Sequence, residues 1–305
     1  MSELAQTWFE SGERVECSFG DHTQTVFRKV VGRPAPGARW VTFLPGWPDG
    51  SYGYSHIDAI LDESLGPRLY LDFVGHGDSD KPREYPYGSF ERADLVEATW
   101  RELGIESTAV VCMDYSVVVA LELLARRRDR AEAGEPRGPA IENWVLMNGG
   151  LFAEGHTHNW YSTPVLKSFI ARPLVWLGQK SRGAFLMFLK PVFSDPKSLP
   201  EGELHAIYDA IARRDGVRTL PKTAHFVDEH LASSERLDFA ALQPTAGAQF
   251  DLIWSPDDSF EGKQLELARE RLDESAFAVT EIPGGHLSTV EQPELVARAI
   301  ERALS

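Results

Sequence analysis

Short apolar runs typical of β-strands alternate along this chain with amphipathic stretches typical of helices. Most neighbouring pairs of the predicted strands are separated by a helical stretch rather than by a tight turn. Such alternation predicts an α/β fold, in which a mostly parallel, eight-stranded sheet is covered by helices on both faces. The predicted strands are residues 14–19, 24–31, 40–44, 68–74, 108–113, 142–148, 249–255 and 277–282. The predicted helices are residues 55–64, 91–103, 115–127, 261–272 and 291–304.

The segment from residue 151 to 245 lacks this alternation. It carries amphipathic helical patterns, such as "TPVLKSFIARPLVWLGQ" and "EGELHAIYDAIARRDG", but no convincing strand, and strand-like sequence then resumes with "FDLIWS". We therefore expect a core domain formed by residues 1–150 and 246–305, and a helical cap domain formed by residues 151–245. An insertion between two strands would lie over the carboxyl edge of the sheet, where ligands bind in open α/β folds.

Charge and composition disfavour several classes of partner. The 305-residue chain has a net charge of −15 at pH 7 and no basic patch that would release counterions from nucleic acid or an anionic membrane surface. No run approaches the ~18 apolar residues of a membrane span, and the amino-terminal sequence lacks the apolar region of a signal peptide. Cys17 and Cys112 lie in apolar strand-like segments and are interpreted as buried thiols. We expect a cytoplasmic protein, either monomeric or homodimeric.

A lone carboxylate stands where a predicted buried strand meets a helix, in "VVCMDYSVVVALELLARR" (residues 110–127). Burying an unpaired carboxylate is costly, so we expect a neighbouring group to use Asp114. The position resembles a nucleophile elbow, whose sharp turn needs small residues two positions before and after the nucleophile, here Cys112 and Ser116. In a rival register Ser116 is the nucleophile, but the β-branched Val118 would crowd that turn. Alternatively, Asp114 serves only as a helix N-cap.

Two later strand ends also carry residues suited to catalysis. "FDLIWSPDDSF" ends a strand in the adjacent acids Asp257 and Asp258, and "TEIPGGHLSTVEQPELV" places His286 after the next strand. Either kind of residue alone usually caps or hydrogen-bonds a turn. The order nucleophile, acid, histidine, each just past a strand, is that of the α/β-hydrolase triad.

The turn in "WVTFLPGWPDGSYGYSHI" (residues 40–57) supplies a fourth element of the predicted site. In α/β-hydrolases the corresponding turn gives one backbone N–H to the oxyanion hole, and the residue after the nucleophile gives the other. Those donors would be the amides of Trp47 and Tyr115. Losing one such donor typically costs about a hundred- to a thousandfold in rate.

These segments together resemble the epoxide hydrolase and haloalkane dehalogenase group of α/β-hydrolases, from about residue 25 to 300. "LPGWPDGSYGY" is similar to the group's H-G-x-P-x-x-S-Y turn, and "RLYLDFVGHGDSDKP" resembles D-x-x-G-x-G-x-S-D-K-P closely. "CMDYSVVVALELL" resembles H-D-[WY]-G-x-x-x-A, and "WSPDDSF" resembles W-G-x-x-D-x-x, which selects Asp258 over Asp257 as the acid. "MNGGLFAE", "ARRDG" and Tyr115 after the elbow aspartate are similar to the mesoderm-specific transcript branch.

The chain departs from the group's pattern around the predicted nucleophile. Pro45 replaces the usual histidine of the oxyanion turn, and Cys112 and Ser116 replace the residues that normally flank the elbow. Dehalogenases of the group place an Asn or Glu and a Trp as paired halide donors, where this chain has Trp47 and Tyr115. The family's halide-binding pair is therefore absent, although both replacements carry an N–H or O–H group.

The resemblance also suggests where a leaving group would bind. Epoxide hydrolases of the group use cap tyrosines to protonate the ring oxygen, and Tyr161 and Tyr208 lie in the predicted cap. Together with Trp47 and Tyr115 they are our candidates for contacts with the substrate or leaving group. No local motif distinguishes either cap tyrosine from a packing or surface residue.

An aspartate nucleophile suits attack on a saturated carbon, which forms an alkyl ester on the enzyme. His286, oriented by Asp258, would then activate a water that hydrolyses the ester at Asp114. We expect a hydrolase without a cofactor that acts on a hydrophobic epoxide and uses water as co-substrate. Haloalkane dehalogenation, the opening of a strained lactone or ester, and ligand binding without turnover on the same fold are the alternatives.

One local pattern suggests a metal but is too short to predict a site. His156 and His158 in "GHTHNWY" are separated by one residue, and no third ligand follows at a known spacing. We therefore expect no metal.

Overall fold

A computed structural model describes residues 2–157 and 163–305 of the chain. At its centre is an eight-stranded sheet in the order β1-β2-β4-β3-β5-β6-β7-β8. The β1–β2 and β2–β4 pairs are antiparallel, and all other neighbouring pairs are parallel, so the predicted sheet is confirmed. The strands are β1 Glu13–Phe19, β2 His22–Val31, β3 Arg39–Leu44, β4 Arg68–Leu71, β5 Ser107–Met113, β6 Ala140–Met147, β7 Gln249–Trp254 and β8 Ala278–Glu281.

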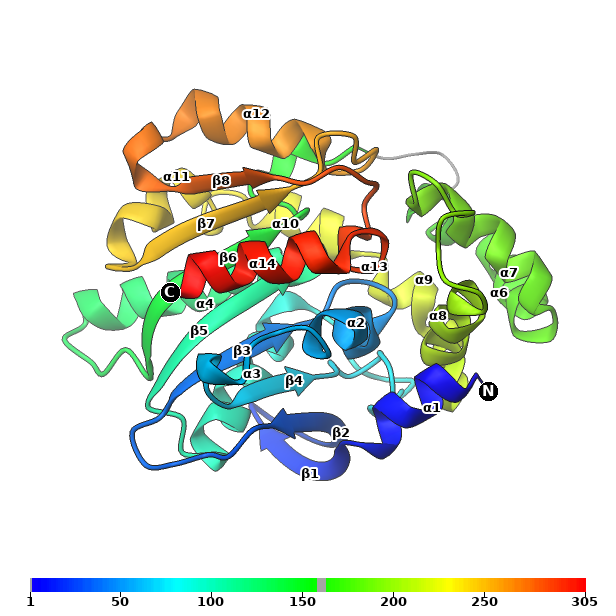
Figure 1. Ribbon diagram of the computed structural model, residues 1–305, viewed down its shortest axis with the longest axis horizontal. Coiled ribbons are helices and arrows are strands. Elements are labelled where there is room, and N and C mark those ends of the chain that lie inside the picture. Colours follow the sequence, from blue (N-terminus) through cyan, green and yellow to red (C-terminus); the bar gives the residue numbers. More distant parts are fainter. Residues whose placement is uncertain (1, 158–162) are drawn as a thin grey trace.

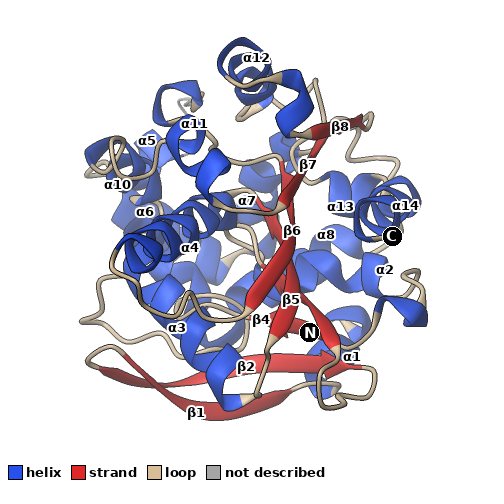
Figure 2. Cartoon of the chain, turned by 90° about the vertical axis from the view of Figure 1, so that its left-hand side faces the viewer, coloured by secondary structure: helices blue, strands red, loops and turns tan. Residues whose placement is uncertain are grey.

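Helices cover both faces of this sheet. Seen nearly edge-on, the sheet has α3, α4 and α11 on one side and α2, α13 and α14 on the other (Figure 2). The helices are α1 Glu3–Glu10, α2 Ser55–Asp58, α3 Ser89–Glu102, α4 Tyr115–Glu132, α5 Thr163–Leu166, α6 Ala171–Lys180, α7 Arg182–Leu189, α8 Glu203–Ala212, α9 Leu220–Thr223, α10 Phe226–Ala232, α11 Phe239–Leu242, α12 Gly262–Arg271, α13 Ser288–Glu291 and α14 Pro293–Leu304.

The central strand β5 shows why this sequence forms a buried sheet. Val110 and Cys112 point into the hydrophobic core on one face, and Val111 and Met113 point into the core on the other. Because successive side chains of a strand face opposite sides, only a continuous apolar run can fill both cores at once. This run delivers the residue after Met113, Asp114, to the carboxyl edge of the sheet.

Three helices differ from the sequence prediction. The helix predicted over residues 55–64 is only one turn long, and α4 continues to Glu132 instead of ending at residue 127. An ion pair from Arg130 to Glu97 of α3 holds the added residues of α4. The amino-terminal helix α1 was not predicted; it buries Trp8 and other apolar residues.

Between β6 and β7 the described residues form helices and no strand, as predicted. Helices α6 to α9 lie beyond the carboxyl ends of the parallel strands (Figure 1). Helix α1 packs against α8 of this insertion, and the Ser2 amide donates to the carboxylate of Asp209. The helical character of the insertion is thus observed, whereas its division from the core as a separate domain stays a prediction. No helix among the described residues is long and apolar enough to cross a membrane.

Candidate active site

Asp114 lies in a sharp turn between β5 and α4, with φ 53° and ψ −123°. A positive φ is strained for any residue with a side chain and persists only where the surroundings enforce it. The Asp114 amide donates to the carbonyl of Met147, 2.9 Å away. The Ser116 hydroxyl accepts from the Met113 amide and lies 2.8 Å from the carbonyl oxygen of Leu44. The hydroxyl of Ser116 is therefore bound to backbone groups of the turn. This disfavours the alternative in which Ser116, not Asp114, is the nucleophile.

Two glycines let neighbouring turns approach this elbow. A Cβ atom at Gly149, in the turn after β6, would lie 2.3 Å from the carbonyl oxygen of Asp114. A Cβ atom at Gly46, in the turn after β3, would lie 3.3 Å from the Cβ of Asp114. Three strand ends therefore converge on one carboxylate, and that convergence depends on residues without side chains at positions 46 and 149.

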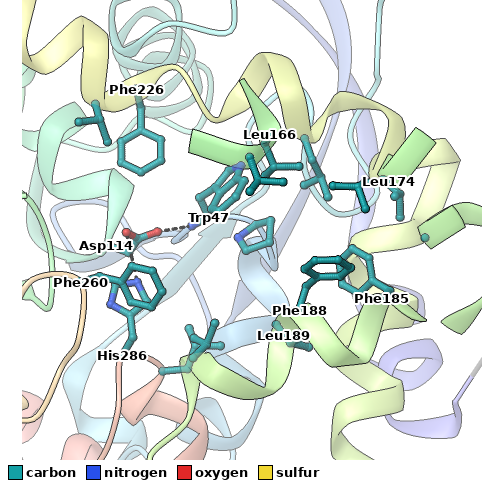
Figure 3. A pocket seen from close by; sticks show the side chains of 18 of the residues that line it. Trp47, Asp114, Leu166, Leu174, Phe185, Phe188, Leu189, Phe226, Phe260 and His286 are labelled. Carbon is teal, nitrogen blue, oxygen red and sulfur yellow. Dashed lines mark hydrogen bonds and ion pairs between the residues drawn. The ribbon is translucent and has the colours of Figure 1, made fainter. Parts of the chain in front are cut away.

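The carboxylate of Asp114 makes two contacts at the edge of a cavity (Figure 3). Its Oδ2 accepts a 2.7 Å hydrogen bond from the backbone amide of Trp47, and its Oδ1 lies 3.3 Å from Nε2 of His286. Tyr115 is the first residue of α4, so its amide has no partner within the helix. The positive end of the α4 dipole also favours negative charge at this point.

His286 connects the elbow to a second, fully buried carboxylate. Its Nδ1 lies 2.8 Å from Oδ2 of Asp258. Asp258 also accepts hydrogen bonds from the side chain of Asn148, at 2.9 Å, and from the amide of Phe260, at 2.8 Å. Of the two adjacent acids, Asp258 is the one that contacts His286, whereas Asp257 is exposed to solvent.

These contacts shift the ionisation of the buried ring and carboxylate. Burial by itself would lower the pKa of His286, but the negative charges of Asp258 and Asp114 raise this pKa well above its ordinary value. Burial by itself would raise the pKa of Asp258, but the charge and hydrogen bond of His286, with backbone amide donors, hold it below its usual range. Both groups are therefore stabilised in their charged forms.

The cavity beside Asp114 has a volume of about 150 Å³ and a mostly apolar lining (Figure 3). An apolar protein cavity of roughly this size binds a molecule such as benzene. Its polar lining comprises Asp114, His286, Thr157, His156 and Glu261. The apolar lining includes Leu166, Leu174, Phe185, Phe188, Leu189, Phe226 and Phe260.

Of the two predicted cap tyrosines, Tyr208 is described by the structure, and it does not reach this cavity. The hydroxyl of Tyr208 donates to the carbonyl of Gly178 at 3.0 Å, and Tyr208 is not part of the cavity lining. Because its hydroxyl is used within the helical insertion, we do not retain Tyr208 as a leaving-group contact. Tyr161 lies outside the described residues.

Trp47 and Tyr115 also use their side chains differently from our expectation. Trp47 lines the cavity, but its indole N–H donates to the hydroxyl of Thr223 at 2.8 Å. The Tyr115 ring is fully buried outside the cavity lining, between the ring of Phe226 and the guanidinium of Arg92, which lies 4.1 Å from the ring centroid. Neither side chain therefore presents a donor to a leaving group in this arrangement.

A buried polar cluster on the cavity wall was not predicted from the sequence. Nδ1 of His156 lies 2.7 Å from Oε1 of Glu261, and its Nε2 lies 2.9 Å from Nδ1 of His230. Burial lowers the pKa of His230 to about 3. The partner proposed for His156 in a metal pair, His158, lies outside the described residues. Among the residues described, no group of three or more His, Cys, Asp or Glu side chains could hold a metal ion.

The sheet, the strained elbow and the carboxylate–imidazole–carboxylate arrangement define the class of this protein. Its fold is that of the α/β-hydrolases, with the three polar residues after strands β5, β7 and β8. The family model described as "Alpha/beta hydrolase family" matches residues 43–299. The chain therefore belongs to the alpha/beta hydrolase family, as the sequence motifs predicted.

Two proteins of similar sequence and one of similar structure accompany this family assignment. The chain is 28% identical over 268 residues to the mesoderm-specific transcript homolog protein of Homo sapiens, covering 87% of this chain and 77% of the relative. It is 29% identical over 280 residues to LipZ of Mycobacterium tuberculosis, covering 90% and 92%. The haloalkane dehalogenase DatA of Agrobacterium tumefaciens C58 has a similar structure, with a TM-score of 0.73, 18% identity and 97% coverage of both chains. At that identity the likeness concerns the fold alone.

Proposed function

We propose that this protein is a hydrolase that attacks a saturated carbon with the carboxylate of Asp114. One observation carries the proposal: the elbow carboxylate borders an apolar cavity and lies 3.3 Å from a histidine that contacts Asp258 at 2.8 Å. A carboxylate in this position forms an alkyl ester with its substrate, whereas a serine would form an acyl ester. The best-supported substrate is a small hydrophobic epoxide.

In the first half-reaction, an oxygen of Asp114 bonds to a ring carbon of the epoxide. The carbon–oxygen bond of the ring breaks, and its electron pair leaves with the oxygen, which takes up a proton that ultimately comes from solvent. Opening the three-membered ring releases its strain, which favours this step. The apolar walls of the cavity hold the substrate beside the carboxylate and keep bulk water away from it.

In the second half-reaction, His286 removes a proton from a water molecule that attacks the ester carbonyl of Asp114. The amide of Trp47 already donates to one oxygen of this carboxylate, so it is placed to stabilise the tetrahedral oxyanion. The amide of Tyr115 at the start of α4 would be the second donor. Collapse of the intermediate releases a diol and leaves on Asp114 one oxygen atom that came from water.

Haloalkane dehalogenation is the second candidate, because a carboxylate nucleophile can also displace a halide from a saturated carbon. A departing halide needs hydrogen-bond donors, but the indole of Trp47 is bonded to Thr223 and the ring of Tyr115 is buried outside the cavity lining. These two side chains therefore do not supply the donor pair that a halide would need, and they do not supply a proton donor for an epoxide oxygen either. The epoxide stays the first candidate because the strain of its ring favours opening. Opening of a strained lactone or ester, and ligand binding without turnover, are the remaining candidates.

A substrate panel tests the proposal. Purified protein is incubated with styrene oxide, 1-bromobutane, a strained lactone and a p-nitrophenyl ester, and diol, bromide, hydroxy acid and phenol are measured. We expect turnover of the epoxide, its loss in Asp114→Ala, and its retention in the matched control Asp257→Asn, because Asp257 is exposed. Full activity of Asp114→Ala on any of these substrates would contradict the mechanism for that substrate, and bromide release without diol formation would select the second candidate.

A further inference from the structure

Helices α6 and α7, with the two residues before α6, expose several large apolar residues. Phe169 is 93% exposed, Met187 is 74% exposed and Trp176 is 60% exposed. Large exposed apolar patches on a folded protein mark interaction sites, whereas isolated apolar residues do not. We name this patch the cap face and define it by Phe169, Ile170, Trp176, Leu177, Met187 and Phe188, which are six of the eleven large apolar residues exposed among the described residues.

The charge of this segment is opposite to that of the whole chain. Residues 155–194 contain no Asp or Glu and five basic residues, although the chain carries a net charge of −15. Arg172, Lys180 and Lys190 are exposed. Lys167 and Arg182 pair with Asp228 and Asp209 from elsewhere in the chain. The acid Asp215 also contacts this segment, through Gln179, but it pairs with Arg218. Because salt screens charges beyond about 8 Å under physiological conditions, a docking partner would sense the exposed basic residues more than acids farther away.

We propose that the cap face docks on an anionic lipid bilayer. Exposed aromatic and aliphatic side chains flanked by Lys and Arg are the composition by which helices lie in a membrane interface. A second copy of this chain fits the face less well, because a symmetric dimer would bring two basic surfaces together. The overall charge of the chain disfavours an anionic surface, as the sequence indicated, but the charge of the segment that would touch the surface favours it.

The cap face is continuous with the cavity described above. Leu174 and Val175 of α6, with Phe185 and Leu189 of α7, line the cavity from the inner side of the same two helices. Phe188 both lines the cavity and is 42% exposed. Only one layer of helices therefore separates the outer surface from the cavity. If the proposed function holds, apolar substrates that concentrate in the bilayer reach Asp114 across this layer; the docking itself does not depend on that function.

Vesicle binding tests the proposal without any substrate. The full-length protein is sedimented with vesicles of phosphatidylcholine alone, and with vesicles that contain about one third phosphatidylserine. We expect at least tenfold more binding to the anionic vesicles, and its loss in about 1 M salt, where charges are screened within about 3 Å. Tryptophan fluorescence should shift to shorter wavelength on binding, because Trp176 enters the interface, and this shift should disappear in Trp176→Phe.

Matched variants separate docking from folding defects. Trp176→Asp should abolish vesicle binding. The double variant Arg172→Glu with Lys180→Glu should weaken binding by roughly fivefold for each basic residue lost. The two new acidic residues should weaken it further. Leu295→Asp, which replaces a comparably exposed apolar residue on α14, should leave binding unchanged. Absence of binding by the wild-type protein, equal binding to both kinds of vesicle, or a concentration-dependent dimer that Trp176→Asp dissociates would each overturn the proposal.

Discussion

Nε2 of His286 lies 3.3 Å from Oδ1 of Asp114, while the opposite nitrogen of the same ring lies 2.8 Å from Asp258. The imidazole is therefore flanked by two carboxylates, whose charges raise the pKa of His286 although burial opposes this. Formation of an ester on Asp114 would remove one of these charges. The pKa of His286 would then fall, and the ring would become a base at the stage when water must be activated.

This relationship predicts that the alkyl-enzyme accumulates as the pH is lowered. Alkylation uses the ionised carboxylate of Asp114 and does not need neutral His286, whereas hydrolysis of the ester does. Lower pH protonates His286 and therefore slows the second step before the first. Rapid acid quenching followed by mass spectrometry of the intact protein should show a growing covalent fraction toward acidic pH. A covalent fraction independent of pH would contradict the role of His286 as the base.

Replacing the histidine should separate the two half-reactions. In His286→Gln the nucleophile remains but the base is lost, so we expect one equivalent of covalently bound substrate and steady-state turnover reduced by about 10³-fold or more. Intact-protein mass spectrometry measures the adduct. His205→Gln, at an exposed position, is the matched control and should turn over normally. If the His286→Gln protein is folded and yet forms no adduct, that result would count against a covalent intermediate.

Replacing each of the two adjacent acids after β7 should have very different effects on kcat. Asp258→Asn removes the charge that orients and stabilises His286, and we expect kcat to fall by about 10³- to 10⁴-fold. Asp257→Asn changes an exposed side chain one position away, so kcat should remain within about twofold. Circular dichroism checks that both variants are folded. Comparable losses in the two variants would show that Asp258 has no particular role.

Asp49 predicts a pH dependence of stability. It is fully buried, neither carboxylate oxygen has a hydrogen-bond partner among the described residues, and burial raises the pKa of Asp49 from 3.8 to about 7. Between these values the folded protein holds a proton that the unfolded chain has lost, so the free energy of unfolding falls as the pH rises.

Asp49→Asn removes this titration. The free energy of unfolding of the variant minus that of the wild type should therefore rise by on the order of 3 kcal/mol from pH about 5 to pH about 8. One pKa unit corresponds to about 1.4 kcal/mol. Urea unfolding at a series of pH values measures the difference. Parallel stability curves for the two proteins would indicate that Asp49 is ionised throughout this range.

The most family-specific sequence motif has a structural role in this protein. In "DFVGHGDSDKP", Asp72 accepts hydrogen bonds from the amides of Ser51 and Asp78, and Lys81 donates to three backbone carbonyls of the loop. A Cβ atom at Gly77 would lie 1.9 Å from Oδ2 of Asp72. The motif thus fixes the loop beside the turn that carries Trp47, and its recognition predicts the fold more directly than the chemistry.

The order of strand ends predicted which segments meet in the site, and the family resemblance selected Asp258 over Asp257. Asp114, Asp258 and His286 each follow a parallel strand, and parallel strands end at a common edge. Helix α1 could also have been predicted, because Ser2 is a suitable N-cap and Ala5, Trp8 and Phe9 have helical spacing.

Other features depend on contacts that no local pattern specifies. His156, His230 and Glu261 come from three distant segments, and each shows an ordinary sequence context. The bond from the Trp47 indole to Thr223 likewise joins residues 176 positions apart. Tyr208 was predicted as a leaving-group contact from its residue type and its place in the predicted cap. Its orientation toward Gly178 depends on packing within the insertion.

The central claim is that Asp114 becomes covalently attached to the substrate. A single turnover in ¹⁸O-water, with protein in excess over styrene oxide, tests it most directly. The mechanism predicts that the first diol contains no solvent oxygen and that the peptide carrying Asp114 gains one ¹⁸O atom. Label in the first diol and none in that peptide would contradict the mechanism, because water would then have attacked the substrate directly.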